Sequence, residues 1–247
     1  MYTPQGPTRR ELAVQALSST EHGYDLLAPK FDQTPFRTSD RLLDAVADAL
    51  RPMGPFGDGL DVCCGTGAGV GVLRRVCRLS VTGLDFSAGM LAEARSARTG
   101  QPDAPAVRWV RADARAMPFT AAFDLATSFG AFGHFLPSER LALFAQVHAV
   151  LRPGGRFVFP IAAPPRVGSL GYWTLAGFDA VMRVRNAVWR PQFVMYYRTF
   201  RLPDVRADLV RAGFTVETPE LAALGRRPDG SPRCRLVVAR RDGTPDR

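Results

Sequence analysis

Residues of a kind that could hold a cofactor lie close together, because the glycine-rich turn Gly65–Gly69 directly follows the apolar run Leu60–Cys64. Glycine lets the backbone come close to a ligand, and unpaired amides at the start of a helix attract polar or anionic groups. The turn favours a nucleotide-like cofactor, with packing as the alternative explanation. It is not a dinucleotide turn, because Val70 and Val72 stand where the fingerprint Gly-x-Gly-x-x-Gly needs its last glycine.

Two carboxylates follow at the ends of the next predicted strands. Asp85 closes one apolar run, and Asp113 closes another with the small residue Ala114 beside it. Parallel strands present their carboxyl ends at one rim of a sheet, where ligands bind and where a carboxylate can accept the hydroxyls of a ribose. Asp85 can equally be a solvated carboxylate before a helix whose N-cap is Ser87.

No metal or redox site is indicated by the four cysteines, Cys63, Cys64, Cys77 and Cys234. They form no Cys-x-x-Cys pair, and histidine or acidic residues at metal-ligand spacing are missing near them. We interpret them as reduced core residues.

The formal net charge is +9 with a pI near 10.2, and Lys30 is the only lysine among the 32 basic residues. The arginines are scattered along the chain instead of gathered on one element, so biased residue usage explains them better than a nucleic-acid surface. A nucleic-acid partner is therefore not expected, and a polyanionic partner stays as the alternative.

The elements that must position the candidate residues alternate along the chain. Short β-rich runs separated by helical patterns predict an α/β fold, a mostly parallel sheet with helices on both faces. Strands are expected at Gly59–Cys64, Leu79–Asp85, Val107–Asp113, Phe123–Phe129 and Arg156–Ile161. Helices are expected at Ser39–Leu50, Gly69–Arg78, Ser87–Arg98 and Ser138–Leu151, with Ser39, Ser87 and Ser138 as N-caps and Pro153-Gly154-Gly155 ending the last.

The flanks of this alternation carry further elements. Tyr24–Pro29 predicts a pair of short helices lying across the sheet edge. Near the end of the chain, Pro203–Ala212 predicts a helix closed by Gly213, and Phe214–Glu217 and Cys234–Ala239 predict a terminal antiparallel hairpin.

The segment 160–200 allows two interpretations. Its aromatic residues either cover an apolar or aromatic substrate or build a small core under a long loop. Its stretch Met182–Arg190 resembles a basic amphipathic helix, which fits contact with a membrane surface or a solvated face. The aromatic residues are Tyr172, Trp173, Phe178, Trp189, Phe193, Tyr196, Tyr197 and Phe200.

Five motifs in register resemble the class I, Rossmann-like S-adenosylmethionine-dependent methyltransferases. The motifs are Leu60–Gly67, Gly83–Leu91, Asp113-Ala114 followed by Met117-Pro118-Phe119, Phe123-Asp124-Leu125, and Leu151–Gly155. The residues of the first motif are most similar to those of the branch that methylates quinone precursors and other small molecules. The resemblance implies a three-layer fold around a seven-stranded sheet, with S-adenosyl-L-methionine as the cofactor.

The resemblance also assigns roles along the cofactor. Asp61, Gly65, Thr66 and Gly67 would line its methionine end, Asp85 would hold the ribose hydroxyls, and Phe86 and Met90 would flank the adenine. Asp113 would accept from the adenine amino group and the Ala114 amide would meet a ring nitrogen, while Ser128 and Phe129 would close over the sulfonium. Tyr24 and Phe31 would belong to an N-terminal lid, with a hydrophobic staple onto the next helix as the alternative. Cys63 departs from the family, which usually has glycine there.

A catalytic base is needed only if the methyl acceptor is a hydroxyl, because the sulfonium already makes the methyl group electrophilic. His134 is the candidate, since it alone of the three histidines lies close to a predicted strand end on the ligand side. The alternative is that His134 only packs. His22 and His148 fit the role less well, and Tyr24 and Tyr197 are weaker candidates.

These features predict one domain over residues 1–247. It divides into an N-terminal tail and lid (1–35), a cofactor-binding core (36–160), a substrate-covering insertion (160–200) and a C-terminal helix and hairpin (201–247).

The predicted function is methyl transfer from S-adenosylmethionine to an O, N or C atom of a small, apolar or aromatic metabolite. The alternatives are methylation of RNA or protein, or a catalytically silent cofactor-binding partner subunit. No apolar run is long enough to span a membrane and the first ten residues do not resemble a signal peptide, so the cytoplasm is the expected compartment. The sequence specifies neither the acceptor nor an oligomeric state.

Overall fold

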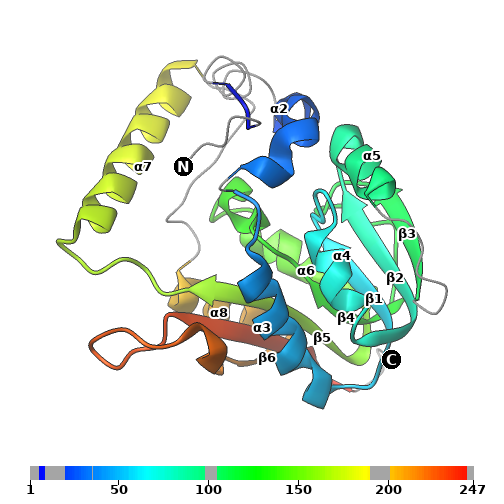
Figure 1. The fold of residues 1–247 in the computed structure, drawn as a ribbon. Coiled ribbons are helices and arrows are strands. Elements are labelled where there is room, and N and C mark those ends of the chain that lie inside the picture. Colours follow the sequence, from blue (N-terminus) through cyan, green and yellow to red (C-terminus); the bar gives the residue numbers. More distant parts are fainter. Residues whose placement is uncertain (1–5, 9–19, 35, 98–104, 190–200, 244–247) are drawn as a thin grey trace.

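The computed structural model describes residues 6–8, 20–34, 36–97, 105–189 and 201–243. A seven-stranded sheet in the order β3-β2-β1-β4-β5-β7-β6 forms its centre (Figure 1). The strands are β1 (Phe56–Val62), β2 (Cys77–Asp85), β3 (Ala106–Arg111), β4 (Phe123–Thr127), β5 (Leu151–Ala162), β6 (Phe214–Glu217) and β7 (Cys234–Arg241). Strands β1 to β5 pair in parallel, and β7 runs antiparallel to both β5 and β6. The predicted sheet and its antiparallel end are confirmed.

Helices cover both faces of the sheet, as parallel connections require. The α-helices are α2 (Thr20–Leu27), α3 (Asp40–Leu50), α4 (Ala68–Leu73), α5 (Ala88–Ser96), α6 (Arg140–Val150), α7 (Leu170–Trp189) and α8 (Leu202–Arg211). The 3-10 helices are η1 (Ala28–Gln33), η2 (Arg51–Met53), η3 (Ala131–His134) and η4 (Ala222–Leu224).

Two apolar clusters lie on the two faces of the sheet. Successive strand residues point to opposite faces, so Phe157 and Phe159 of β5 join one cluster and Val158 joins the other. The first cluster contains buried apolar residues of α6 and α8, and the second contains buried apolar residues of α3 and α4. The sheet is therefore packed on both faces.

The ends of two helices differ from the prediction. α4 ends at Leu73 and not at Arg78, because β2 already begins at Cys77. α6 begins after Glu139, so Ser138 is not its N-cap, and it ends at Val150, before the Pro153-Gly154-Gly155 segment predicted to stop it. That segment lies inside β5. Ser87 caps α5 by accepting a hydrogen bond from the Met90 amide, whereas the Ser39 side chain makes no capping bond to α3.

The N-terminal pair of short helices is present as α2 and η1, and it packs on α5. α7 stands apart from the helices that cover the sheet (Figure 1). Its residue Trp173 is 63% exposed, so this aromatic side chain does not belong to a small core. The aromatic residues Phe193, Tyr196, Tyr197 and Phe200 lie outside the described residues.

Within the described part of the chain, none of the helices has the length and apolar character that crossing a bilayer requires. The division into lid, core, insertion and C-terminal unit stays a prediction.

Candidate active site

A cavity of about 520 Å³ opens at the carboxyl ends of β1, β2 and β3, and residues Tyr24, Phe31 and Phe36 of the N-terminal part of the chain line it as well. This is the rim at which open α/β sheets bind ligands, and the size is that of a small-molecule site. Its apolar wall is rich in aromatic rings, and its polar groups include the carboxylates of Asp61, Asp85 and Asp113 at the strand ends. The aromatic lining residues are Tyr24, Phe31, Phe36, Phe86, Phe129 and Phe135.

The glycine turn forms the floor of this cavity. Gly65 and Gly67 have φ values of 52° and 88°, in the left-handed region that glycine adopts without strain. A β-carbon added at Gly65 would meet no atom within 4 Å, so the backbone of the turn faces open space. A β-carbon at Gly69 would instead come within 2.4 Å of the Asp61 carboxylate and 2.5 Å of the Phe129 ring. One glycine therefore leaves room for a ligand, and another lets Asp61 and Phe129 come together.

The carboxylates of Asp61 and Asp85 are buried at this floor, and the two residues are 1% and 6% exposed. Asp61 Oδ1 accepts a hydrogen bond of 3.0 Å from the Thr127 hydroxyl. Asp85 accepts 2.8 Å and 2.9 Å bonds from the backbone N–H groups of Gly65 and Ser87. Burial raises the pKa of Asp85, although these backbone donors favour the ionised form and oppose the shift. Asp85 thus ties the glycine turn to the start of α5.

Cys63 lines the same floor and has a φ of 59°. Burial, and then the negative charges of Asp85 and Asp61, raise the pKa of its thiol well above the ordinary value. The thiol is therefore protonated at neutral pH and contributes a small neutral group to the cavity wall.

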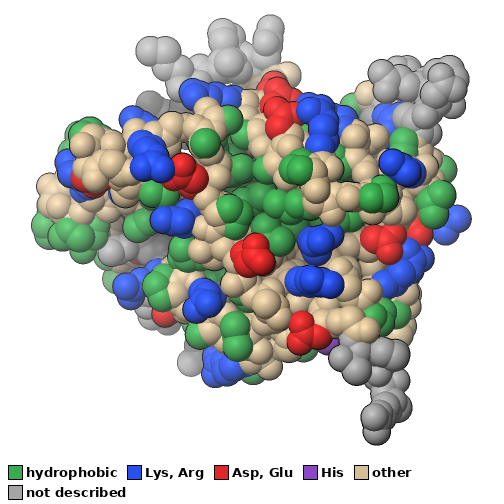
Figure 2. Space-filling view, turned by 90° about the horizontal axis from the view of Figure 1, so that it is seen from below, with side chains coloured by type: hydrophobic (Ala, Val, Ile, Leu, Met, Phe, Trp, Pro, Cys, Tyr) green, Lys and Arg blue, Asp and Glu red, His purple; other side chains and the backbone are tan. Residues whose placement is uncertain are grey.

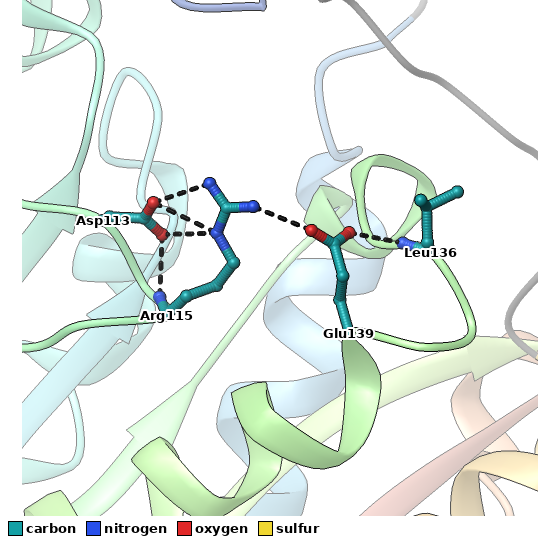
Figure 3. Close-up of polar contacts among 4 residues, drawn as sticks. All are labelled: Asp113, Arg115, Leu136 and Glu139. Carbon is teal, nitrogen blue, oxygen red and sulfur yellow. Dashed lines mark hydrogen bonds and ion pairs between the residues drawn. The ribbon is translucent and has the colours of Figure 1, made fainter.

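Arg115 joins two carboxylates across one side of the cavity (Figure 3). Its Nε and Nη2 donate to the Asp113 carboxylate at 3.0 Å, 3.1 Å and 2.7 Å, and its Nη1 donates to Glu139 Oε1 at 2.7 Å. The hydrogen bonds from Arg115 hold the pKa of Asp113 below its usual value. Asp113 therefore stays ionised at the rim of the sheet.

His134 and Tyr24 form a hydrogen-bonded pair that also lines the cavity. The Tyr24 hydroxyl lies 2.6 Å from His134 Nε2, and the two rings meet edge to face with centroids 5.2 Å apart. The hydroxyl donates when Nε2 carries no proton, and Nε2 donates when it does. Two groups that the sequence offered as separate base candidates are therefore one unit.

The N-terminal segment is held over the cavity by polar contacts to three other elements. Asp25 Oδ1 accepts from the Ser87 hydroxyl at 2.6 Å and from the Gly89 amide at 2.8 Å, which fixes α2 on the start of α5. Glu21 pairs with Arg111 of β3, and Asp32 accepts from the Thr66 hydroxyl of the glycine turn at 2.6 Å. We call residues 20–33 the roof.

Comparisons with known proteins agree with this geometry. A family model described as a methyltransferase domain matches residues 60–155. The demethylmenaquinone methyltransferase of Thermus thermophilus is 32% identical over 166 residues, which cover 64% of this chain and 74% of that protein. The chain belongs to the class I S-adenosylmethionine-dependent methyltransferases.

Two further relatives place the chain within this family. The O-methyltransferase cnsE of Penicillium expansum is 37% identical over 132 residues, covering 53% of this chain and 46% of that protein. The crystal structure of an S-adenosylmethionine-dependent methyltransferase from Mesorhizobium loti is 28% identical, with a TM-score of 0.53, covering 81% of this chain and 100% of that one. This methyltransferase is accordingly an enzyme that transfers the methyl group of S-adenosylmethionine to a small molecule.

The cavity of this methyltransferase fits such a cofactor. The open space above Gly65 admits a ligand against the backbone, and the carboxylates of Asp61, Asp85 and Asp113 offer acceptors along the rim. Among the described residues, no cluster of three or more histidine, cysteine or acidic side chains could hold a metal ion.

Most of the predicted site residues line this one cavity. They are Tyr24, Phe31, Asp61, Gly65, Thr66, Asp85, Phe86, Met90, Asp113, Ala114, Phe129 and His134. Gly67 is the N-cap of α4, and the buried Ser128 hydroxyl donates to the Val62 carbonyl at 2.8 Å, so both support the wall without lining it. None of the described residues of 160–189 lines the cavity, and Tyr197 lies outside the described residues.

Sequence reasoning missed Arg115, Glu139, Arg37 and Leu136 as lining residues of the methyltransferase site. Arg115 stands two positions from Asp113, which was a usable signal. Glu139 gave no signal, because the start of α6 approaches the end of β3 only in the folded chain.

The arginines of this methyltransferase do not form one basic patch on the face that Figure 2 shows. Lys and Arg side chains are spread over that face and alternate with acidic ones.

Proposed function

We propose that this methyltransferase acts on a small apolar acceptor with an aromatic ring, of the phenol or quinol class. The observation that carries this proposal is the aromatic wall of the cavity, in which Phe31, Phe36 and Phe135 face the same space as the Tyr24–His134 pair. Aromatic side chains bind planar rings by offset stacking and edge-to-face contact. A demethylmenaquinone methyltransferase among the relatives supports a ring acceptor, and an O-methyltransferase supports a hydroxyl oxygen as well as a ring carbon.

The cofactor would lie along the strand ends, with its methionine part over Gly65, Thr66 and Asp61. Asp85 would accept from the ribose hydroxyls, because its carboxylate is held in place by two backbone amides. Phe86 and Met90 would flank the adenine, with Asp113 and Ala114 at its edge and Phe129 near the sulfonium. When bound, the cofactor supplies an electrophilic methyl group on sulfur.

The Tyr24–His134 pair would take up the proton that a hydroxyl acceptor loses. The Tyr24 oxygen would accept the hydroxyl proton when the acceptor is methylated, and the proton of the Tyr24 hydroxyl would move to His134 Nε2. The 2.6 Å separation allows this transfer without movement of either side chain.

A methylation screen tests the proposal. Radiolabelled methyl transfer from S-adenosylmethionine is measured with phenols, quinols, amines and RNA, beside calorimetric binding of S-adenosylhomocysteine. We expect turnover with ring hydroxyl acceptors. Turnover with RNA alone, or cofactor binding without turnover on any acceptor, would reject it in favour of a nucleic-acid enzyme or a silent subunit.

Substitution of the pair tests proton transfer. His134→Ala and Tyr24→Phe should each lower kcat for a hydroxyl acceptor by about 100-fold, because general-base catalysis contributes at least that much, with S-adenosylhomocysteine affinity little changed. The double variant should be no slower than either single one, since the two groups act as a unit. Unchanged kcat across the pH range would show that the pair only packs.

Helix α7 supports peripheral contact with an anionic membrane as part of the proposal. Leu170, Trp173, Val181 and Val184 lie on one side of this helix and are 63–85% exposed, while its only acidic residue, Asp179, is buried. An apolar stripe on a helix whose remaining charges are arginines matches an anionic lipid surface.

Substitution of the exposed valines of α7 tests this contact. Val181→Asp/Val184→Asp should abolish sedimentation with anionic phospholipid vesicles. Retained sedimentation, or dimerisation through α7 in place of lipid binding, would contradict this.

The proposed compartment is the cytoplasm. All four cysteines carry free thiols, which suits a reducing environment.

A further inference from the structure

The Arg115 side chain connects Asp113 to Glu139, and Glu139 is in turn bound by a backbone amide. Starting at the loop before α6, the Leu136 amide donates to Glu139 Oε2 at 2.8 Å, and Glu139 Oε1 accepts from Arg115 Nη1 at 2.7 Å. Arg115 then grips Asp113 with Nε and Nη2 (Figure 3). A backbone group at one end therefore determines where the carboxylate at the other end lies.

Arg115 would be free to move without this support. Its side chain is 51% exposed, and an exposed arginine ordinarily samples many rotamers. Two carboxylates bound at different edges of the planar guanidinium limit it to one arrangement, and paired hydrogen bonds from Nε and Nη2 to Asp113 fix the relative orientation of the two groups. The position of the Asp113 carboxylate is thereby set in a part of the rim that is otherwise open.

Hydrogen-bond donors already occupy most of the acceptor positions of the Asp113 carboxylate. A carboxylate offers about four lone-pair positions. Three separate N–H groups, the Arg115 amide, Nε and Nη2, already occupy the two oxygens. The remaining capacity suits one further N–H donor, and the charge is already balanced by the guanidinium. Such a group selects a single neutral donor and not a cation or a pair of hydroxyls.

We propose that Arg115 is a positioning residue for the adenine end of the cofactor, fixing the Asp113 carboxylate so that it accepts one hydrogen bond from the exocyclic amino group. This inference rests on the adenine placement given under the proposed function. Glu139 acts one step further away, by holding Arg115. Both residues line the cavity, and neither touches the reacting atoms in this assignment.

The test compares two ligands that differ only in the group at the amino position of the purine ring. S-adenosylhomocysteine carries the amino donor, and its analogue with an unsubstituted purine carries a hydrogen atom in its place; we call this ligand the purine analogue. Affinities for both are measured by calorimetry in the native protein, Arg115→Met, Glu139→Gln and Asp113→Ala. Arg108→Met is the matched control, since Arg108 is an exposed arginine of β3 outside the cavity.

We expect the native protein to prefer S-adenosylhomocysteine by about tenfold, the effect of one hydrogen bond to a charged group. Arg115→Met should lose most of this preference with little change in affinity for the purine analogue, Glu139→Gln should lose part of it, and Arg108→Met should retain it. Thermal unfolding should be almost unchanged in Arg115→Met, because half-exposed ion pairs contribute little to stability.

The outcomes distinguish the role of Arg115 from the adenine placement on which it depends. If Asp113→Ala removes the preference and Arg115→Met keeps it, the role of Arg115 is refuted while the adenine placement stands. If Asp113→Ala keeps the preference, the adenine placement is wrong and the inference falls with it. Absence of binding of either ligand to the native protein would refute the cofactor assignment itself.

Discussion

Asp85 illustrates how one residue combines a structural and a binding role. Its oxygens accept the Gly65 and Ser87 amides, so the carboxylate sets the distance between the glycine turn and α5. It also lines the cavity where the ribose is proposed to lie. A carboxylate that is already oriented by two amides loses little freedom when a ligand binds, which favours affinity.

Asp85→Ala should weaken binding of S-adenosylhomocysteine by about 1–3 kcal/mol, because the ribose hydroxyls lose a charged acceptor in a buried site. Calorimetry measures this difference. Asp124→Ala is the control, since that carboxylate pairs with Arg152 and does not line the cavity. Equal affinity of the native and Asp85→Ala proteins would place Asp85 outside the binding site.

Cys63 shows what the sequence can and cannot indicate at this scale. Its departure from the glycine usual in the family was visible, and so was its place beside the turn. The sequence did not show the backbone conformation at this position. Cys63 has a left-handed φ of 59°, which glycine adopts without strain, and it lies where β1 turns into the glycine loop. A side chain in that conformation costs about 1–2 kcal/mol, which the rest of the fold must outweigh.

The order of strands and helices could be predicted, because the apolar residues of each segment repeat with the spacing of either a strand or a helix. The boundaries could not be predicted where the same residues fit both the end of one element and the start of the next. The apolar pair Val76-Cys77 fits both the end of a helix and the start of a strand, and the fold gives Cys77 to β2. Gly154, with a φ of 80°, was predicted to end a helix but lies within β5, beside an irregularity in its pairing with β4.

The roof is the element whose stability is most open to a local test. Asp25→Ala removes the acceptor for the Ser87 hydroxyl and the Gly89 amide, and should destabilise docking of α2 by about 1–3 kcal/mol. Hydrogen exchange of the α2 amides should then become about tenfold faster or more.

The control for this prediction is Asp48→Ala, which breaks an exposed pair with Arg51 far from the roof. It should leave exchange in α2 unchanged. Equal exchange in Asp25→Ala and the native protein would show that Asp25 does not hold the roof.

At the scale of the whole molecule, arginines join distant parts of the chain through backbone carbonyls. Arg241 donates to the carbonyls of His148 and Leu151, and Arg156 donates to that of Met53. The high arginine content thus contributes to tertiary structure. This use could not be inferred from composition, because it depends on which loops the fold brings near each guanidinium.

The pair between Arg140 of α6 and Asp208 of α8 predicts how stability depends on pH. Both side chains are buried, 2.7 Å apart. Burial alone would raise the pKa of Asp208, but hydrogen bonds from Arg211 and Arg140 outweigh it, and the pKa lies below the unfolded value near 3.8. The pair therefore stabilises the fold above that value, and this contribution is lost as pH falls through the lower folded pKa.

Urea unfolding of the native protein and Asp208→Asn measures this contribution. At pH 7 the variant should be less stable by about 3 kcal/mol, because a buried ion pair between Arg140 and Asp208 is replaced by a hydrogen bond to a neutral amide. The difference should shrink below pH 4. A difference that is independent of pH would show that the ionised form of Asp208 does not stabilise the fold.

The roof has a consequence for the kinetics of turnover. Its residues Tyr24 and Phe31 line the cavity, and hydrogen bonds and an ion pair join it to α5, to β3 and to the glycine turn. We expect the spent cofactor to leave only after these contacts have opened. Rapid mixing should therefore reveal an initial burst of methylated product close to one equivalent per enzyme, followed by a slower steady rate that Asp25→Ala accelerates.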